Sequence, residues 1–276
     1  MNIIGLGKAG CNIADAFAKY PQYSIFKIDD DFKSSEEHVY TIAKRGSHEE
    51  YEEKCPNFEE FFKAIDEDVL LVFSGASTVS GCALGLLEQI SGHPVSILYV
   101  RPDISLLSET KAIQEKIVYN ILQEYARSAV FERMYIISNV EVEKILGDVP
   151  IIGYYDTINN TIVSTFHMLN VFSYSNPIMG TFAKPVESAK ISTFGVLNIE
   201  KDEEYLFFDL KFPRDRVYYY GINEDTLKTD GKLFKKITDF VKSKSEENVS
   251  ISYGVFDTNY EENYGYYIAY SSMIQD

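Results

Sequence analysis

The first half of the chain alternates short apolar runs with segments of helical spacing. Val69 to Phe73 is a continuous apolar run, which is typical of a strand buried on both faces of a sheet. The expected strands are 2–5, 23–28, 69–73, 95–100 and 134–137, and the expected helices are 12–19, 82–90 and 109–127. Strands that alternate with helices predict an α/β fold, in which a mainly parallel sheet carries helices on both faces.

The pattern changes in the second half of the chain. Residues 156–172 have the apolar spacing of one long central helix, and Pro177 marks its end. The strands expected beyond it are 191–199, 205–212, 216–221, 249–256 and 264–271, with a helix at 230–244. We therefore expect a parallel-sheet domain over residues 1–155, the central helix and its following loop over 156–188, and a smaller α+β C-terminal domain over 189–276.

Composition narrows the classes of function. The 276-residue chain has a net charge of −16, which argues against non-specific nucleic-acid binding because such binding depends on Lys and Arg. No apolar run approaches the roughly 20 residues that span a bilayer, and the N-terminus has no secretory layout. We therefore expect a cytoplasmic protein with no nucleic-acid or membrane partner. The scattered Cys11, Cys55 and Cys82 predict reduced thiols rather than a disulfide framework or a metal site.

A glycine-rich loop follows the first expected strand. The segment Gly5 to Gly10 fits the pattern GxGxxG, and Asp29 lies about 20 residues further on. Glycines here would let the backbone approach a pyrophosphate at a helix N-terminus, and the acid would hold a ribose hydroxyl. Alone, this loop favours an NAD(P)-dependent Rossmann oxidoreductase, although no hydride-transfer residue is recognisable. A tight turn that binds no ligand is the other interpretation.

A second loop of small residues helps to separate these interpretations. Ser74 to Gly81 follows the buried strand at 69–73 and opens another helix. A fold that holds a triphosphate from two sides requires such a loop, whereas a dinucleotide fold does not. Here the chain resembles the tubulin/FtsZ family. Gly75 to Gly81 is similar to the family's GGGTGxG loop, and Gly7 to Ile13 is similar to its GQCGNQI and GGGGGNA versions.

Further motifs that resemble the family follow in the same order along the chain. Residues 99–102 resemble its strand ending in a Lys-Pro-Phe type turn, and residues 136–139 resemble its Ile-Ile-Pro-Asn strand. Residues 155–159 resemble the start of its central helix, and residues 248–257 with 266–273 resemble the last hairpin of the FtsZ C-terminal domain. The resemblance therefore covers nearly the whole chain.

The resemblance implies a protein that binds GTP or GDP with Mg²⁺ and assembles head to tail into filaments of itself. Tyr155 would stack on the guanine, and Asn159, or Asn160 one position further on, would pair with the edge of the base. Mg²⁺ would be held through the phosphates, with no metal site of the protein's own. The residues placed around the phosphates are Gly7, Lys8, Ala9, Gly10, Cys11, Asn12, Asp31, Gly75, Ala76, Ser77, Thr78, Val79, Ser80 and Gly81.

The second loop departs from the family's pattern. Ala76, Ser77 and Val79 stand where the signature has glycines. Their Cβ atoms resist positive φ, so the loop is expected to bind phosphate less tightly or to adopt another shape. A tubulin-like scaffold without nucleotide binding is therefore an alternative function.

The loop after the central helix departs from the pattern as well. In the family, acids of this loop reach the nucleotide of the next subunit. The corresponding positions fall on Ala183 and Val186, neither of which can orient water. Glu187 is the nearest acid and the one candidate catalytic residue. The sequence therefore predicts weak or absent GTP hydrolysis.

Overall fold

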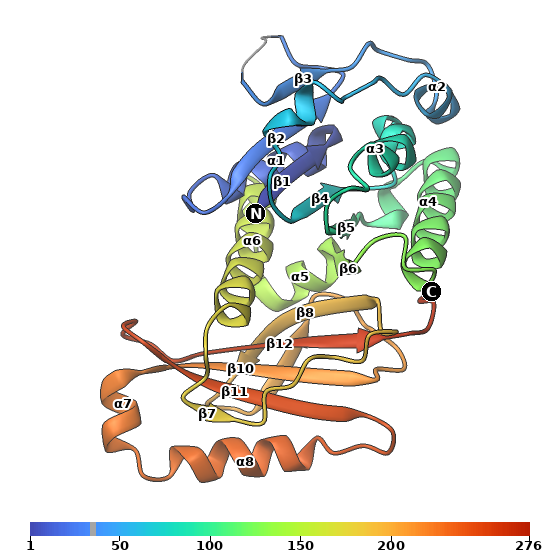
Figure 1. Ribbon diagram of the computed structural model, residues 1–276. Coiled ribbons are helices and arrows are strands. Elements are labelled where there is room, and N and C mark those ends of the chain that lie inside the picture. Colours follow the sequence, from blue (N-terminus) through green and yellow to red (C-terminus); the bar gives the residue numbers. More distant parts are fainter. Residues whose placement is uncertain (34–36) are drawn as a thin grey trace. The chain divides into compact units, whose positions relative to one another are not determined.

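In the computed structural model, which describes residues 1–33 and 37–276, the chain divides into two units, residues 1–163 and 164–276 (Figure 1). The division falls inside helix α6 (Tyr154–Ser173), which corresponds to the predicted central helix. The predicted apolar face of α6 is buried, with Ile158, Ile162 and Phe166 at most 6% exposed. In the part of the chain that the structure describes, no helix is long and apolar enough to cross a membrane.

The first unit is built on a parallel sheet, as predicted. Its strand order is β3-β2-β1-β4-β5-β6, and each neighbouring pair is parallel. The strands are β1 (Asn2–Leu6), β2 (Ser24–Asp29), β3 (Val39–Thr41), β4 (Val69–Phe73), β5 (Val95–Arg101) and β6 (Arg133–Ser138). Every residue of β1 and β4 is buried. Because these two strands are parallel neighbours, the loops that follow them leave the same edge of the sheet.

The helices of the first unit connect these strands, and Figure 1 shows α4 along one side of them. They are α1 (Gly7–Phe17), α2 (His48–Glu53), α3 (Ala83–Gln89), α4 (Glu109–Arg127) and α5 (Asn139–Leu146), with short 3₁₀ helices η1 (Phe61–Ala64), η2 (Thr78–Cys82) and η3 (Ile104–Leu106). The predicted bounds of α4 are confirmed. Helix α1 begins at Gly7 rather than at Asn12, because the glycine-rich loop is itself the first turn of the helix.

The second unit is a mixed sheet whose strand order is β8-β12-β10-β11-β7, with β9 paired to β8. Only the β10–β11 pair is parallel among the pairings described for this unit. The strands are β7 (Met179–Gly180), β8 (Ile191–Asn198), β9 (Glu203–Leu206), β10 (Asp215–Asn223), β11 (Ser250–Thr258) and β12 (Tyr264–Ser271); the helices are α7 (Glu224–Thr229) and α8 (Leu233–Ser243). This is the predicted α+β arrangement.

Tyrosines of β10 alternate between the two faces of this sheet, as their period of two requires. Tyr218 and Tyr220 belong to the core that Ile237 of α8 covers. Tyr219 points to the other face, where its ring stacks on Phe256 with centroids 6.2 Å apart. Figure 1 shows α8 running along the sheet on the side of that core.

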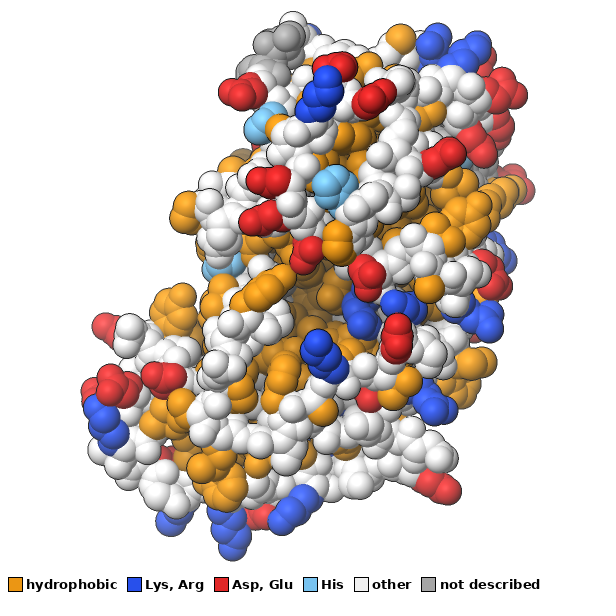
Figure 2. Space-filling view, viewed as in Figure 1, with side chains coloured by type: hydrophobic (Ala, Val, Ile, Leu, Met, Phe, Trp, Pro, Cys, Tyr) orange, Lys and Arg blue, Asp and Glu red, His pale blue; other side chains and the backbone are white. Residues whose placement is uncertain are grey.

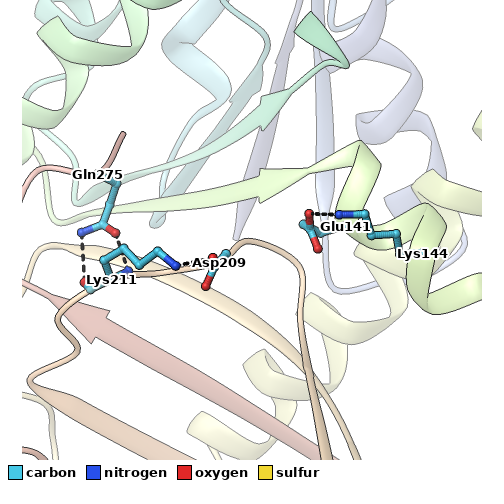
Figure 3. Close-up of polar contacts among 5 residues, drawn as sticks. All are labelled: Glu141, Lys144, Asp209, Lys211 and Gln275. Atoms are coloured by element: carbon cyan, nitrogen blue, oxygen red, sulfur yellow. Dashed lines mark hydrogen bonds and ion pairs between the residues drawn. The ribbon is translucent and has the colours of Figure 1, made fainter. Parts of the chain in front are cut away.

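The strand expected over 205–212 is shorter in the structure, because β9 ends at Leu206. Phe212 has a φ of 51°, which no strand residue adopts, and Pro213 follows it. The backbone of Lys211 is instead held by the Gln275 side chain. The Lys211 N–H donates to Gln275 Oε1 at 2.7 Å, and Gln275 Nε2 donates to the Lys211 carbonyl oxygen at 3.2 Å (Figure 3).

Figure 3 also shows two ion pairs on separate elements. One joins Lys211 to Asp209, and the other joins Glu141 to Lys144 within α5 at 2.7 Å.

Candidate functional site

The three glycines of the first loop have three different physical roles. A Cβ on Gly5 would lie 2.6 Å from the Gly10 carbonyl oxygen, so this glycine permits the tight turn from β1 into α1. Gly7 has a φ of 70°, which strongly favours glycine. A Cβ on Gly10 would overlap the Val72 carbonyl oxygen, so this glycine permits close packing of α1 on β4. The three roles are those that GxGxxG loops have in nucleotide-binding α/β folds.

The other residues of this loop separate into exposed and buried ones. Lys8, Ala9 and Asn12 are exposed at the start of α1, where its free N–H groups create positive potential. Cys11 is 3% exposed, and its thiol donates to the Gly5 carbonyl oxygen at 3.3 Å. Burial raises the pKa of Cys11 to about 12, and Asp29 adds to the increase. Of the predicted phosphate ligands, Gly10 and Cys11 are thus packing residues, and the exposed ones remain candidates.

A short acidic turn follows β2. Asp29 is 8% exposed, and its Oδ1 accepts a hydrogen bond from the Asp30 N–H at 2.9 Å. Burial raises the pKa of Asp29, and the charges of Asp30 and Asp31 raise it further, whereas the Asp30 N–H and Lys8 lower it. The Tyr51 hydroxyl donates to Asp30 and accepts from the Arg45 N–H at 3.0 Å. Asp31 is exposed, which leaves it as the accessible carboxylate of the turn.

The second loop folds without any positive φ between residues 74 and 81, all of which the structure describes. The Ser77 N–H donates to the Ser74 carbonyl oxygen at 3.3 Å, and η2 begins one residue later. Ser80 is 3% exposed, and its Oγ lies 2.6 Å from the Ser77 carbonyl oxygen. Ala76, Ser77 and Val79 therefore fit the loop without backbone strain, because its shape does not require glycine at their positions. The Ser80 hydroxyl therefore forms its hydrogen bond within the loop itself.

Residues of α4 and β5 contact the second loop and hold it in place. Gln114 donates from Nε2 to the carbonyl oxygens of Gly75 and Ser77, at 2.7 and 2.9 Å. A Cβ on Gly75 would overlap the Tyr99 hydroxyl, whose oxygen lies 3.3 Å from Glu115 Oε1. Glu115 is fully buried and forms an ion pair with Arg101 at 3.2 Å. The loop thus rests on a buried polar network.

The two loops are in contact at the carboxyl ends of β1 and β4. A Cβ on Gly7 would lie 2.8 Å from the Ser77 Oγ, so the first turn of α1 and the second loop are in contact. The structure thus brings Gly7 of the first loop next to Ser77 of the second loop. This edge, at the carboxyl ends of neighbouring parallel strands, is where α/β sheets bind ligands.

The residues predicted to hold the base lie at the start of α6. Tyr155 is 62% exposed, so its ring is available for stacking, and Asn159 is 9% exposed. The Asn160 amide is already occupied, since its Oδ1 accepts from Lys19, two residues after the end of α1, at 3.0 Å and its Nδ2 donates to the Asp156 carbonyl oxygen at 2.8 Å. Of the two alternatives for the pairing amide, Asn160 is thus hydrogen-bonded within the protein and Asn159 is largely buried.

The loop after α6 lies in the second unit. Glu187 is exposed there, as are Ala183 and Val186. The Val186 N–H donates to Oδ2 of Asp215 at 3.1 Å, and Asp215 is 4% exposed. This contact anchors the residue next to Glu187. Among the described residues, no three His, Cys, Asp or Glu side chains gather into a metal site.

A cavity that sequence reasoning missed borders the second loop. It has a volume of 480 Å³ and is lined by Thr78 and Gly81 of the loop, by Leu84 of α3, and by Ile113 and Ile117 of α4. Ile113 and Ile117 are more than half exposed, one helical turn apart. Their spacing on α4 was visible in the sequence, but the facing wall comes from a distant segment.

The geometry of the first unit defines the class: a parallel α/β unit with two loops facing each other at adjacent strand ends, the arrangement of nucleotide-binding α/β proteins. No model of a protein family matches the sequence, and no curated protein matches it. Solved structures do match. A protofilament of TubZ from Bacillus thuringiensis serovar israelensis in the GTPγS form aligns with a TM-score of 0.75 at 14% identity, covering 99% of this chain and 87% of TubZ.

Two other structures match over a similar length. FtsZ of M. jannaschii aligns with a TM-score of 0.68 at 12% identity, covering 98% of this chain and 87% of FtsZ. The GTPγS-bound protofilament of CetZ2 from Haloferax volcanii aligns with a TM-score of 0.67 at 14% identity, covering 98% of this chain and 92% of CetZ2. The chain therefore has the tubulin/FtsZ fold, as its motifs indicated.

Proposed function

We propose that this chain binds GTP and GDP with Mg²⁺ and self-associates head to tail into filaments, with weak or absent GTP hydrolysis. The observation that carries the proposal is the match of 99% of the chain to TubZ in a GTPγS-form protofilament. Contact between the first turn of α1 and the second loop supports it, because a triphosphate needs donors on two sides.

The phosphates would bind at the N-terminus of α1. Backbone N–H groups there attract anions, and the exposed Lys8 adds a positive charge at this edge of a chain whose net charge is −16. The absence of a side chain at Gly7 leaves room for a phosphate oxygen near Ser77. Mg²⁺ would be held by phosphate oxygens, with the exposed Asp31 as a candidate carboxylate.

The base would lie against α6. Tyr155 offers an exposed ring for stacking, and Asn159 lies one helical turn further on, on the same side of the helix. An amide can both donate to and accept from the edge of guanine.

Weak hydrolysis follows from the loop after α6. Only Glu187 carries an acid near the expected catalytic positions, and its neighbour Val186 is fixed by Asp215. A carboxylate one residue out of place does not orient water efficiently, because general-base catalysis depends on hydrogen-bond reach. Binding and polymer assembly would then proceed with slow turnover.

An NAD(P)-dependent oxidoreductase is the second candidate, because the strand order 3-2-1-4-5-6 of the first unit is also that of dinucleotide-binding folds. Such a protein would prefer NAD to GTP. A tubulin-like scaffold would bind neither and could still polymerise.

Calorimetry of the full chain with GTP, GDP, ATP and NAD in the presence of Mg²⁺ tests all three functions. Selective GTP binding, with polymer detected by light scattering and slow phosphate release, is the expected result. Gly7→Ala should weaken binding, because its Cβ would narrow the space near Ser77, whereas Gly92→Ala, whose Cβ would meet nothing within 4 Å, should not. Preference for NAD, or no nucleotide binding at all, would refute the proposal.

A further inference from the structure

Cys55 and Cys82 come from separate segments of the first unit, yet they are in contact in the fold, and each thiol shifts the pKa of the other. Cys55 follows α2, and its Sγ also lies 3.6 Å from the Cys82 carbonyl oxygen. Cys82 is the last residue of η2, is fully buried, and donates from Sγ to the Tyr51 carbonyl oxygen at 3.3 Å. Both cysteines are free thiols.

The two thiols differ in access and in acidity. Cys55 is half-buried and lines an open cavity of 510 Å³ together with Lys63, Gln89 and His93. Interaction with the Cys82 thiol lowers the pKa of Cys55, whereas interaction with the Cys55 thiol and burial raise the pKa of Cys82. Because the thiolate is the reactive form, a solute in the cavity would meet the more reactive member of the pair.

Gly85 of α3 makes room for this arrangement. A Cβ at this position would lie 2.9 Å from the Cys55 Sγ and 3.1 Å from its Cβ, and it would meet no other neighbour within 4 Å. Gly85 has no positive φ, so its backbone does not require glycine. The glycine therefore places the Cys55 sulfur beside Cys82.

We propose that Cys55 and Cys82 form a reversible disulfide, in which a hydroperoxide oxidises Cys55 and Cys82 then resolves the product. The Cys55 thiolate attacks the peroxide, an S–O bond forms as the O–O bond breaks, and an alcohol or water leaves. The Cys82 sulfur attacks the resulting sulfenic acid, the S–S bond forms as the S–O bond breaks, and the departing hydroxide takes the Cys82 proton as water. The two thiols lose two electrons and the peroxide gains them.

The disulfide would fix the second loop to the end of α2. The Cys82 thiol would leave the Tyr51 carbonyl oxygen, and Tyr51 is the residue whose hydroxyl contacts Asp30 beside the first loop. Oxidation therefore acts on both sides of the candidate phosphate site. An effect on nucleotide binding rests on the proposed function, whereas formation of the disulfide does not.

Peptide mapping of the full chain by mass spectrometry after treatment with hydrogen peroxide tests the proposal. A linked pair of peptides containing Cys55 and Cys82, separated again by dithiothreitol, is expected, with Cys11 still reduced. Cys55→Ser should abolish the link, and Cys82→Ser should accumulate Cys55 sulfenic acid that dimedone traps. Gly85→Ala should slow formation by about tenfold, because it displaces the attacked sulfur, whereas Gly92→Ala should leave the rate unchanged.

Three results would overturn the proposal. They are oxidation of Cys55 to sulfinic acid without a link, disulfides only between chains, or an unchanged rate in Gly85→Ala. Because the map needs no nucleotide, it decides the disulfide even when the reduced protein binds no GTP. Failure of the reduced protein to bind GTP would instead refute the proposed function.

Discussion

Substitution of Gly10 by alanine tests the packing on which the candidate site depends. A Cβ at this position would overlap the Val72 carbonyl oxygen and lie 3.1 Å from the Val72 carbonyl carbon and 3.3 Å from the Phe73 Cα. All three are backbone atoms of the fully buried strand β4, so no side chain can rotate away. Helix α1 would have to move off the sheet and carry Gly7 and Lys8 with it.

The cost of this movement is large enough to measure. Overpacking in a tight core costs about 1–3 kcal/mol or more, and contact with fixed backbone belongs at the upper end. Alanine has a better helix propensity than glycine, which stabilises the variant by about 1 kcal/mol. We therefore expect the free energy of unfolding to fall by roughly 2 kcal/mol. For a chain of this size that corresponds to a fall in Tm of about 4–8 °C.

Thermal unfolding followed by circular dichroism measures the change, and hydrogen exchange of the β4 amides assigns it to the first unit. Gly92→Ala is the matched control, since its Cβ would meet nothing within 4 Å. A Gly10→Ala variant that unfolds at the temperature of the control would refute the close packing of α1 on β4. The assigned role of the third glycine would then be wrong.

Three further predictions concern the buried network, the phosphate site and the tyrosines. Glu115→Ala removes the fully buried carboxylate that faces Arg101 and should cost about 3–5 kcal/mol in urea unfolding; a loss below about 1 kcal/mol would contradict this. Lys8→Ala should weaken GTP binding in calorimetry by about tenfold, with Tm unchanged because Lys8 is exposed; equal affinity would remove Lys8 from the site. Burial raises the pKa of Tyr218 and Tyr267 far above the usual value near 10, and that of Tyr51 to about 12. Stability should therefore be full below about pH 10 and fall as pH rises further, because the unfolded phenols ionise first; absorbance titration in which all native tyrosines ionise near pH 10 would contradict this.

The sequence predicts those elements whose burial is regular. Helix α4 and strands β4 and β12 have the predicted bounds, because each carries a long run of apolar positions at one period. Helix α2 was not predicted, since only Tyr51 of its residues is buried and one buried residue gives no period. Its start depends instead on Ser47, whose hydroxyl accepts from the Glu50 N–H at 3.3 Å.

The candidate site was predicted in position but not in detail. Glycine spacing located both loops, yet the packing roles of Gly10 and Cys11 depend on β4 and on Gly5, which no local pattern reveals. The contact between Cys55 and Cys82 arises only when α2 packs on η2. Spacing along the chain cannot predict such a contact.

Surface charge bears on how a nucleotide would reach the candidate phosphate site. Figure 2 shows acidic and basic side chains intermingled over the face in view, with hydrophobic side chains exposed between them. With a net charge of −16, long-range attraction of an anion is unfavourable, so a nucleotide would depend on short-range donors. The N-terminus of α1 and Lys8 supply such donors, which is why Lys8→Ala is the sharper test of affinity than any change in total charge.

The departures from the tubulin/FtsZ pattern in the second loop and in the loop after α6 therefore have different physical consequences. The second loop does not need the positive φ values that glycines allow, because it has ordinary φ values and is held in shape by hydrogen bonds from Gln114 and the Ser80 hydroxyl. Loss of those glycines is thus compatible with a preformed phosphate site. The proposed loss of hydrolysis concerns the loop after α6, where the Val186 N–H donates to the buried Asp215 carboxylate and Glu187 is the next residue. Under the proposed function, binding and hydrolysis would depend on different loops, so one could be kept while the other is lost.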